Sequence, residues 1–465
     1  MRYSYVFKPI ILGIIPNFTG ISDPYEAPTN ADIDIQSGEK TITEWIDDII
    51  AFLVSNNVLS SQASTYADVG ELYDFSEELA KTAEELESVT IDEERVQLLH
   101  VLADGWAGKL NNFMNEMELL EVLHYKTITD RNGQRYLHSV PITWPVSKES
   151  AEKLENQPRI ALRHFSTNEV LGVIEKPVFF LNRKEEICTR LFGTHSKEHP
   201  KIQKMYEEGD YLLTGESLKV VKKVLYNDGL DEYRLTPNQI QELAKEKSAD
   251  VVYAFQLRNP LHNGHVMLLN STRDMLIERG YKNPVLLLHP CGGWTKDDDV
   301  PLDIRMQQHQ AIIDDNELNK DQTILAIWPS PMYYAGPSEV LWHVASRLNA
   351  GVEYFIVGRD PAGINHPEID GESLYDPFHG QKVLQLGKDL FHRSIEIMPF
   401  KVAAYNTKEK KMMFFNPAIK EEFEFISGSR MRQLARDGLD PPEGFMNQNG
   451  WKIMKDYYNG LKEQS

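Results

Sequence analysis

The hydrophobic and polar positions change their spacing along the chain, most clearly between residues 251 and 280. Val251–Phe255 is an unbroken run of apolar, β-prone residues, and the mostly polar stretch Gln256–His265 follows it directly. From Val266 to Arg279 the apolar residues recur at helical spacing, and Gly280 closes the pattern. The order of strand, polar turn and helix predicts the first half of a βαβ unit.

The same alternation continues towards the C-terminus. Strands are expected at 284–289, 323–328, 353–357 and 395–400, and helices at 302–313 and 337–348. A further helix is expected to begin with Thr236 as its N-cap and Pro237 at its first position. Strands that alternate with helices predict a parallel sheet with right-handed crossovers, so the fold class is α/β.

The chain before residue 223 has other patterns. Residues 43–56 and 72–86 have helical spacing with a solvated face, which is acidic in the second segment. Further helical segments are expected within 96–124, where Trp106 and Phe113 are candidate core residues. Short apolar runs separated by turns fill much of the following part of the chain and predict a β-rich domain.

These patterns divide the chain into four parts and place a helical tail at its end. The predicted parts are an N-terminal arm (1–40), a helical lead-in with the β-rich domain (41–222), a catalytic α/β domain (223–405) and a C-terminal subdomain (406–465). Within the last part, helices are expected at 430–436 and 451–461.

Composition narrows the function classes. The formal net charge of −21 disfavours a general nucleic-acid binder. The chain has only two cysteines, Cys188 and Cys291, which disfavours a disulfide framework or a cysteine-based zinc site and suits a reducing compartment. No run approaches the ~18 apolar residues of a membrane span, so no membrane partner is expected.

The N-terminal segment bears on the compartment. Its apolar residues are interrupted by Lys8, Pro9 and Pro16, which does not fit a secretory signal. It is either the remnant of an organelle-targeting segment or an arm that packs on the protein. We therefore expect a cytoplasmic location, with a plastid or another organelle as the alternative.

Candidate chemistry is concentrated in Gln256–His265, which reads QLRNPLHNGH. Arg258 is a permanent cation whose planar fork suits a tetrahedral oxyanion. His262 and His265 stand three residues apart around Gly264, so both rings can face one phosphate chain. The following helix adds free backbone N–H groups for an anion. Such a density of polar groups after a buried strand is difficult to explain by packing.

The pattern QxRNPxHxGH resembles the active-site signature of the ATP sulfurylase family, and HxGH is shared by a wider nucleotidyltransferase superfamily. The resemblance runs from about Glu93 to the C-terminus and includes plant-type enzymes and the sulfurylase half of bifunctional PAPS synthases. Other similar stretches are LLLHPCGGWTKDDDVPLDIRMQQHQ (286–310), PSPMYYAGPSEVLWH (329–343), IVGRDPAG (356–363) and FISGSRMRQLA (425–435).

The resemblance implies a fold and a set of site residues. The expected fold is a PUA-like β-barrel domain, a Rossmann-like HxGH nucleotidyltransferase domain and a small helical C-terminal subdomain. The implied catalytic residues are Leu257, Arg258, Asn259, His262 and His265, and the implied sulfate-binding residues are Gln256, Arg258 and Ala362. The implied ATP-binding residues are Gln256, Asn259, His262, His265, Gly358, Arg359, Asp360, Phe400, Ala403, Ser427 and Arg432.

The implied activity is that of a sulfate adenylyltransferase. It joins ATP and sulfate into adenosine 5′-phosphosulfate and pyrophosphate, with Mg²⁺ bound with ATP rather than to a metal site of the protein. Asp297, Asp298 and Asp299 are expected to cap the next helix rather than to hold Mg²⁺. Relatives suggest a homodimer. No GxxxxGK[ST] motif occurs, so the kinase half of a PAPS synthase is absent and its chemistry is not expected.

Two alternatives remain open from the sequence. One is an HxGH adenylyltransferase with a different acceptor, against which the flanking QxRNP and GRDPAG motifs argue. The other is a non-catalytic nucleotide sensor, against which the presence of Arg258, His262 and His265 argues. The sequence does not decide the direction of flux, or whether a separate kinase or a reductase uses the product.

Overall fold

The computed structural model describes residues 70–130, 133–399, 401–426 and 428–464, together with Ile49 and Phe52. The predicted arm 1–40 and, apart from Ile49 and Phe52, the predicted helix 43–56 lie outside the described residues. Residues 68–465 form one compact unit, and the description below concerns this unit.

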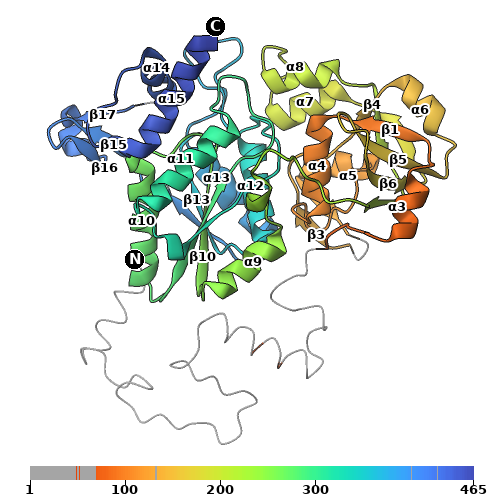
Figure 1. Cartoon of the computed structure of the whole chain (residues 1–465), viewed down its shortest axis with the longest axis horizontal. Coiled ribbons are helices and arrows are strands. Elements are labelled where there is room, and N and C mark those ends of the chain that lie inside the picture. The colour runs from red at the N-terminus through yellow and green to blue at the C-terminus, as the bar shows by residue number, and fades with distance from the viewer. Residues whose placement is uncertain are drawn as a thin grey trace, which may run out of the picture. The chain divides into compact units, whose positions relative to one another are not determined.

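A five-stranded parallel sheet forms the centre of the C-terminal half (Figure 1). Its strand order is β12-β11-β10-β13-β14, and every neighbouring pair is parallel. The strands are β10 (Val251–Leu257), β11 (Pro284–Pro290), β12 (Thr323–Leu325), β13 (Tyr354–Val357) and β14 (Glu396–Pro399). Strands β10, β11 and β12 thus follow one another towards one edge of the sheet. The chain then crosses back, and β13 pairs with the other side of β10. The predicted parallel α/β sheet is confirmed.

Helices cover both faces of this sheet. Alternate residues of β10 belong to different cores: Tyr253 and Phe255 contact the core that includes α10 and α11, whereas Val252 and Ala254 contact the core that includes α9 and α12. Burial on both faces explains why the strands are continuous apolar runs. The helices are α9 (Pro237–Glu246), α10 (Asn263–Glu278), α11 (Leu302–Asp314), α12 (Pro337–Asn349) and α13 (His379–Gly387).

The predicted start of α9 is confirmed at atomic detail. The side chain of Thr236 accepts a hydrogen bond from Gln239 N, and the Gln239 side chain accepts one from Thr236 N, which makes a reciprocal capping box. Pro237 occupies the first turn, as expected.

The part before residue 223 contains three separate sheets rather than one closed sheet. Their strand orders are β1-β5-β6-β9, β4-β8-β7 and β2-β3, so the expected barrel is not confirmed among the described residues. The strands are β1 (Ser88–Ile91), β2 (Thr127–Thr129), β3 (Arg135–Leu137), β4 (Pro145–Val146), β5 (Arg159–His164), β6 (Val170–Glu175), β7 (Val178–Leu181), β8 (Tyr211–Thr214) and β9 (Ser217–Val220).

Helices accompany these sheets, and the acidic segment 72–86 forms a shorter helix than predicted. That helix is α3 (Glu77–Ala83). The others are α4 (Glu93–Ala103), α5 (Glu116–Tyr125), α6 (Lys148–Leu154), α7 (Lys184–Phe192) and α8 (Pro200–Glu207). Trp106 and Phe113 are fully buried, as predicted.

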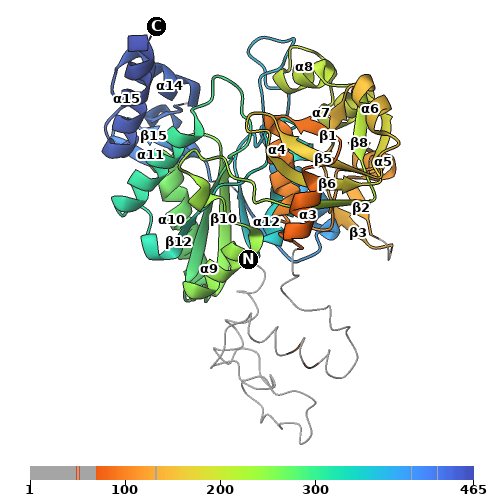
Figure 2. The same ribbon diagram turned by 45° about the vertical axis from the view of Figure 1, so that its right-hand side comes forward.

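The C-terminal subdomain is mixed, which corrects the prediction that it is helical. Strands β15 (Ala403–Asn406), β16 (Lys411–Phe414) and β17 (Phe423–Glu424) form an antiparallel sheet before helices α14 (Gly428–Asp437) and α15 (Gln448–Gln464) (Figure 2). The strands are short and separated by charged turns, so their alternation is too brief to be detected in the sequence. Short 3₁₀ helices occur at Asp231–Tyr233, Lys320–Gln322, Lys388–Leu390 and Pro417–Glu422.

The largest hydrophobic core joins the N-terminal β-rich part to the parallel sheet. The ring of Trp106 lies 5.1 Å from that of His289 on β11, and Trp106 O accepts a hydrogen bond from Asn349 Nδ2 at 3.0 Å. Tyr333 OH donates to Pro141 O at 2.9 Å. The two parts therefore share one buried interior.

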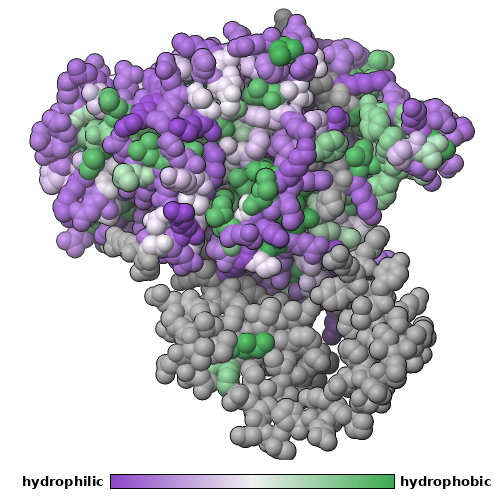
Figure 3. All heavy atoms as spheres, turned by 180° about the vertical axis from the view of Figure 1, so that it is seen from behind, coloured by the Kyte–Doolittle hydropathy of each residue, from purple (hydrophilic) through white to green (hydrophobic). Residues whose placement is uncertain are grey.

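Figure 3 shows one face of the molecule, on which hydrophilic residues cover most of the described surface and apolar residues form scattered patches. None of the helices in the described part of the chain has the length and apolar character needed to cross a membrane.

A core truncation tests the role of the sheet. Leu287, at the middle of β11, is fully buried, so Leu287→Ala is expected to lower the free energy of unfolding by about 2–5 kcal/mol. Leu386→Ala is the matched control, because Leu386 is 83% exposed and its loss is expected to cost less than about 0.5 kcal/mol. Urea titration measures both. Equal midpoint shifts would contradict the buried position of β11.

Candidate active site

A cavity of about 460 Å³ opens at the carboxyl ends of β10 and β13. These neighbouring strands lie where the strand order of the sheet reverses, and ligands of open α/β sheets bind in the crevice at this point. Most of the predicted site residues line the cavity: Gln256, Leu257, Arg258, Asn259, His265, Gly358, Arg359, Asp360 and Ala362.

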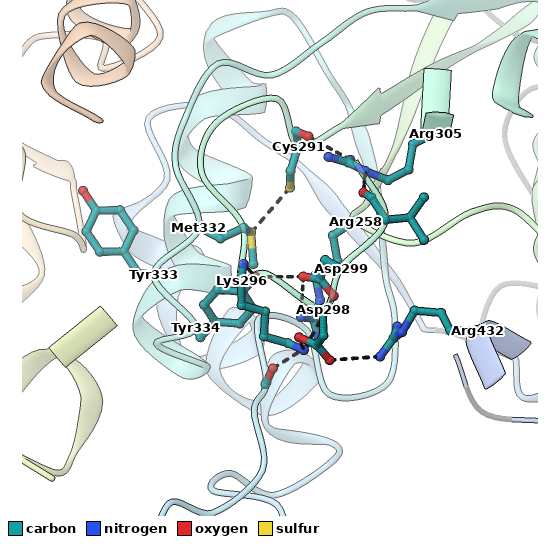
Figure 4. A network of polar contacts seen from close by, with 12 residues as sticks. Arg258, Cys291, Lys296, Asp298, Asp299, Arg305, Met332, Tyr333, Tyr334 and Arg432 are labelled. Carbon is teal, nitrogen blue, oxygen red and sulfur yellow. Dashed lines mark hydrogen bonds and ion pairs between the residues drawn. The ribbon is translucent and has the colours of Figure 1, made fainter. Parts of the chain in front are cut away.

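Arg258 is held by protein groups on several sides (Figure 4). Its Nη1 lies 3.4 Å from Asp299 Oδ2, its Nη2 donates to Gly363 O at 3.2 Å, and its guanidinium lies 5.1 Å from the centre of the Tyr334 ring. Desolvation opposes the charge of Arg258, but Asp299 and Tyr334 outweigh it and raise the pKa above its usual value. With its side chain 23% exposed, Arg258 is a fixed cation that still faces the cavity.

Asp299 corrects a prediction. Helix α11 has Pro301 as its N-cap and no capping side chain, so Asp299 does not cap it. Instead, the buried Asp299 Oδ2 accepts from Tyr334 OH at 2.8 Å and pairs with Arg258. Arg258 is the reason: its guanidinium gives the buried carboxylate the cationic partner without which a buried charge would be uncompensated.

His262 and His265 form a stacked pair at the start of α10. Their ring centres are 3.8 Å apart and their planes differ by 20°. His262 Nδ1 accepts from Gly264 N at 3.1 Å, and His265 Nδ1 accepts from His262 N at 3.4 Å. Since Nδ1 accepts in both rings, the proton of each neutral imidazole lies on Nε2.

Both rings are neutral at neutral pH. Desolvation lowers the pKa of His262 to about 4. Desolvation lowers the pKa of His265 as well, and the neighbouring rings of His262 and His309 add to this effect. The pair therefore consists of neutral hydrogen-bond donors, which suits phosphate oxygens and leaves no strong base at this point.

Gly264 allows the pair to form. A Cβ at this position would lie 2.7 Å from Met412 Cε, the end of a flexible side chain, and 3.0 Å from the ring of His262, so a larger residue would require both side chains to shift. The glycine thus leaves room for the His262 ring and for the Met412 side chain of β16.

The loop after β13 has an unusual backbone. Asp360 and Ala362 have φ values of 48° and 54°, which are uncommon for residues with a side chain. A Cβ at Gly363 would lie 2.0 Å from Asp360 Oδ1, so any other residue there would require the Asp360 side chain to move. Asp360 Oδ1 is buried without a hydrogen-bond partner among the described residues, and desolvation raises the pKa of this carboxyl. Such strain often accompanies a ligand-binding loop.

Comparison with known proteins bears on what this cavity does. Residues 231–457 match the ATP-sulfurylase family and residues 71–223 match the PUA-like domain family. The chain is 45% identical to ATP sulfurylase 2 of Arabidopsis thaliana over 381 residues, which cover 82% of this chain and 79% of that protein. The chain belongs to the ATP sulfurylase family.

Other relatives agree with the family assignment. Identity to ATP sulfurylase 4, chloroplastic, of Arabidopsis thaliana is 42%, over 80% of this chain and 78% of that protein. Identity to the sulfate adenylyltransferase of Persephonella marina is 29%, over 79% of this chain and 90% of that protein. The solved structure of a hexameric APS kinase from Thiobacillus denitrificans has the same fold, with a TM-score of 0.61, 17% identity, and coverage of 84% of this chain and 67% of that one. The predicted family is confirmed.

Some residues that the family resemblance implied do not line the cavity. His262 stacks behind His265, and Ala403 on β15 packs against the C-terminal core. Arg432 of α14 lies 3.4 Å from Asp298 Oδ2, and Lys296 pairs with the same carboxylate. Phe400 and Ser427 lie outside the described residues.

The sequence reasoning missed several residues that line or support the cavity. His343 of α12 lies in the cavity wall with its Nε2 3.2 Å from Gln256 Nε2, and Met332 and Ser373 also line the cavity. Tyr334 supports Arg258. The segment 329–343 was recognised as similar to the family, but helical spacing alone could not show which of its side chains face the site.

The described residues do not build a metal site. Among them, no group of three or more His, Cys, Asp or Glu residues is placed to hold an ion. The nearby carboxylates of Asp298 and Asp299 are engaged by Arg432, Lys296, Arg258 and Tyr334.

The neutral histidine pair predicts acid sensitivity. Folded His262 has a pKa of about 4 against an ordinary value of 6.5, so the unfolded chain binds more protons between these pH values and stability falls as pH falls through this window. We expect His262→Gln to remove about one proton from the uptake on unfolding. Urea titrations from pH 6.5 to 4.5 measure it. An unchanged slope in His262→Gln would contradict the buried neutral pair.

Proposed function

We propose that this chain transfers the adenylyl group of ATP to sulfate and releases pyrophosphate, as a sulfate adenylyltransferase. The observation that carries the proposal is Arg258, fixed by Asp299 at the point of strand-order reversal and facing the same cavity as Gln256, His265 and the loop after β13. Membership of the ATP sulfurylase family supports it, as do relatives named sulfate adenylyltransferase. The comparisons thus confirm the predicted sulfate adenylyltransferase activity.

Sulfate is held by Arg258, Gln256 and the backbone at Ala362. Arg258 supplies a desolvated fork of N–H donors, which is the geometry that a tetrahedral oxyanion prefers. Ala362 belongs to the loop of unusual backbone that also lines the cavity, and its neighbour Gly363 accepts a hydrogen bond from Arg258. An anion beside these groups is neutralised by Arg258 and bound by the loop.

ATP occupies the rest of the crevice. Asn259, His262 and His265 bind its phosphates through neutral donors. The backbone N–H groups at the start of α10 are engaged within the protein, contrary to the expectation from the sequence: Asn263 N donates to Phe445 O, and Gly264 N donates to His262 Nδ1. Leu257 ends β10 and shapes the wall beside them. The remaining nucleotide contacts are assigned to Gly358, Arg359, Asp360, Phe400, Ala403, Ser427 and Arg432.

The reaction is a direct displacement. A sulfate oxygen attacks the α-phosphorus, a new P–O bond to sulfate forms, and the bond from the α-phosphorus to the pyrophosphate oxygen breaks. Sulfate is already ionised, so no general base is needed, which agrees with the low pKa values of His262 and His265. When bound with ATP, Mg²⁺ neutralises charge on the phosphates. The protein contributes position and N–H donors.

The remaining expectations are part of the same proposal. We assign residues 41–222 to a supporting role, residues 223–405 to catalysis and residues 406–465 to completion of the nucleotide site, in a homodimer. A relative named chloroplastic supports a plastid as the alternative to the cytoplasm. An adenylyltransferase with another acceptor is less well supported, because Gln256 and Arg258 together suit a small oxyanion.

Loss of Arg258 tests the sulfate site. We expect Arg258→Ala to lower sulfate-dependent pyrophosphate release from Mg·ATP by at least about a hundredfold, because a charge-assisted donor pair and the partner of Asp299 are both lost. Arg279→Ala is the control, since this arginine pairs with Glu396 on the surface. If release requires sulfate and only Arg258→Ala loses it, the assignment stands. Sulfate-independent release, or wild-type activity in the variant, would contradict it.

The stereochemical course tests direct displacement. With ATP made chiral at the α-phosphorus by one sulfur substituent, a single in-line attack inverts the configuration, whereas a covalent adenylyl-enzyme would give net retention. We expect inversion in the product, determined by ³¹P NMR after conversion to a reference compound. Retention would mean that a side chain of the protein acts as nucleophile.

A further inference from the structure

The amide of Gln256 has one satisfied end and one unsatisfied end. Its Nε2 lies 3.2 Å from His343 Nε2 and 3.1 Å from Cys291 Sγ. Its Oε1 is buried and has no hydrogen-bond partner among the described residues, although Gln256 lines the cavity. Of the two ends of the amide, only the oxygen end lacks a partner among the described residues.

Glu339 decides which nitrogen of His343 carries the proton. Both oxygens of the fully buried Glu339 accept backbone hydrogen bonds, from Tyr333 N and Ala335 N, each at 3.0 Å. Glu339 Oε1 also lies 3.4 Å from His343 Nε2, one helical turn further along α12. An unprotonated Nε2 would set its lone pair against the charged carboxylate oxygen, whereas a protonated Nε2 can donate to it, so His343 Nε2 carries the proton.

The protonated Nε2 of His343 conflicts with the NH₂ group placed opposite it. Desolvation lowers the pKa of His343, so the ring is neutral and has a single N–H. With that N–H directed at Glu339 and at Gln256, two donors face each other across 3.2 Å. The oxygen and nitrogen of an amide have nearly the same shape, and exchanging them resolves the conflict.

We propose that Glu339, His343 and Cys291 fix the Gln256 amide with its oxygen towards His343 and its NH₂ group towards the cavity. In this orientation Gln256 Oε1 accepts from His343 Nε2, and the two N–H donors take the position that now lacks a partner. An amide with its NH₂ group forward binds an anion, whereas one with its oxygen forward repels it. His343 is thus a positioning residue for sulfate, an inference that rests on the proposed function of Gln256.

The surroundings keep His343 in one orientation. The Trp328 ring meets the His343 ring edge-on, with centres 5.1 Å apart and planes at 90°. His343 is 2% exposed and lies on α12, whose Glu339 is fixed by the backbone of the preceding loop. Cys291 Sγ lies at the same end of the amide as His343, 3.1 Å from Gln256 Nε2, and contacts Met332 through sulfur. The chain from Glu339 to Gln256 is therefore rigid, as positioning requires.

The kinetic test separates sulfate from ATP. We expect His343→Leu to raise the KM for sulfate about tenfold, because the amide can rotate, while the KM for ATP changes less than about threefold. His343→Gln should restore the sulfate KM to within about threefold of wild type, since its Nε2 can replace the lost donor. His138→Gln is the matched control: His138 is also buried and packs on Trp342 of α12, but is remote from the amide. It should leave both constants unchanged.

A direct test observes the proton. In a spectrum of ¹⁵N-histidine-labelled full-length protein, assigned by the loss of one signal in His343→Gln, we expect His343 to carry its proton on Nε2. A proton on Nδ1 would overturn the inference. So would an equal rise of both KM values in His343→Leu, or a failure of His343→Gln to restore the sulfate KM.

Failure of this inference differs from failure of the proposed function. Gln256→Leu should raise the KM for sulfate at least as much as His343→Leu does. If Gln256→Leu raises it and His343→Leu does not, Gln256 binds sulfate without help from His343 and only the inference is wrong. If neither variant changes it, Gln256 is not a sulfate ligand, and that part of the proposed function is wrong as well.

Discussion

The parallel pairing of β10 with β13 is the constraint on which the site depends. This pairing, Tyr253 to Tyr354 and Phe255 to Ile356, joins the first strand of the sheet to the fourth, so the connections before and after it run in opposite directions. The two strands end at the same edge without a crossover to cover them. The backbone topology alone therefore creates the crevice, whatever side chains line it. The motif QLRNPLHNGH begins at the end of β10, and the motif GRDPAG follows β13.

The second requirement is a fixed positive charge in an acidic protein. With a net charge of −21, a flexible surface cation would be drawn to neighbouring carboxylates. Arg258 is instead held by one buried carboxylate, one backbone carbonyl and one aromatic ring. The β-rich part contributes to this arrangement, because Gln97 Oε1 accepts from Trp294 N at 2.8 Å, and Tyr334 OH accepts from Lys296 N at 2.8 Å. The loop that carries Asp299 is thereby fixed by both parts of the molecule.

Much of the fold was predictable because the strands of a parallel sheet are long apolar runs and the helix starts have specific caps. β11, α12 and the capped start of α9 match their predictions closely. The C-terminal sheet escaped detection, since strands of two to four residues carry too little periodicity. The prediction that Asp299 caps a helix was wrong. Whether this carboxylate pairs with the start of α11 or with Arg258 depends on the tertiary structure, which the local sequence does not show.

The candidate site was predictable where motif and strand end coincide, as at Gln256, Arg258 and His265. It was not predictable for His343. This residue faces the cavity because of the orientation of α12 about its own axis, which is set by the packing of the helix against the sheet. The central claim, that sulfate binds between Arg258 and Gln256, is tested most directly by locating the anion. In crystals of the full chain soaked with selenate, the account predicts an anomalous selenium peak within hydrogen-bond reach of both side chains. A peak only beside Lys296 and Arg432, with none at Arg258, would contradict it.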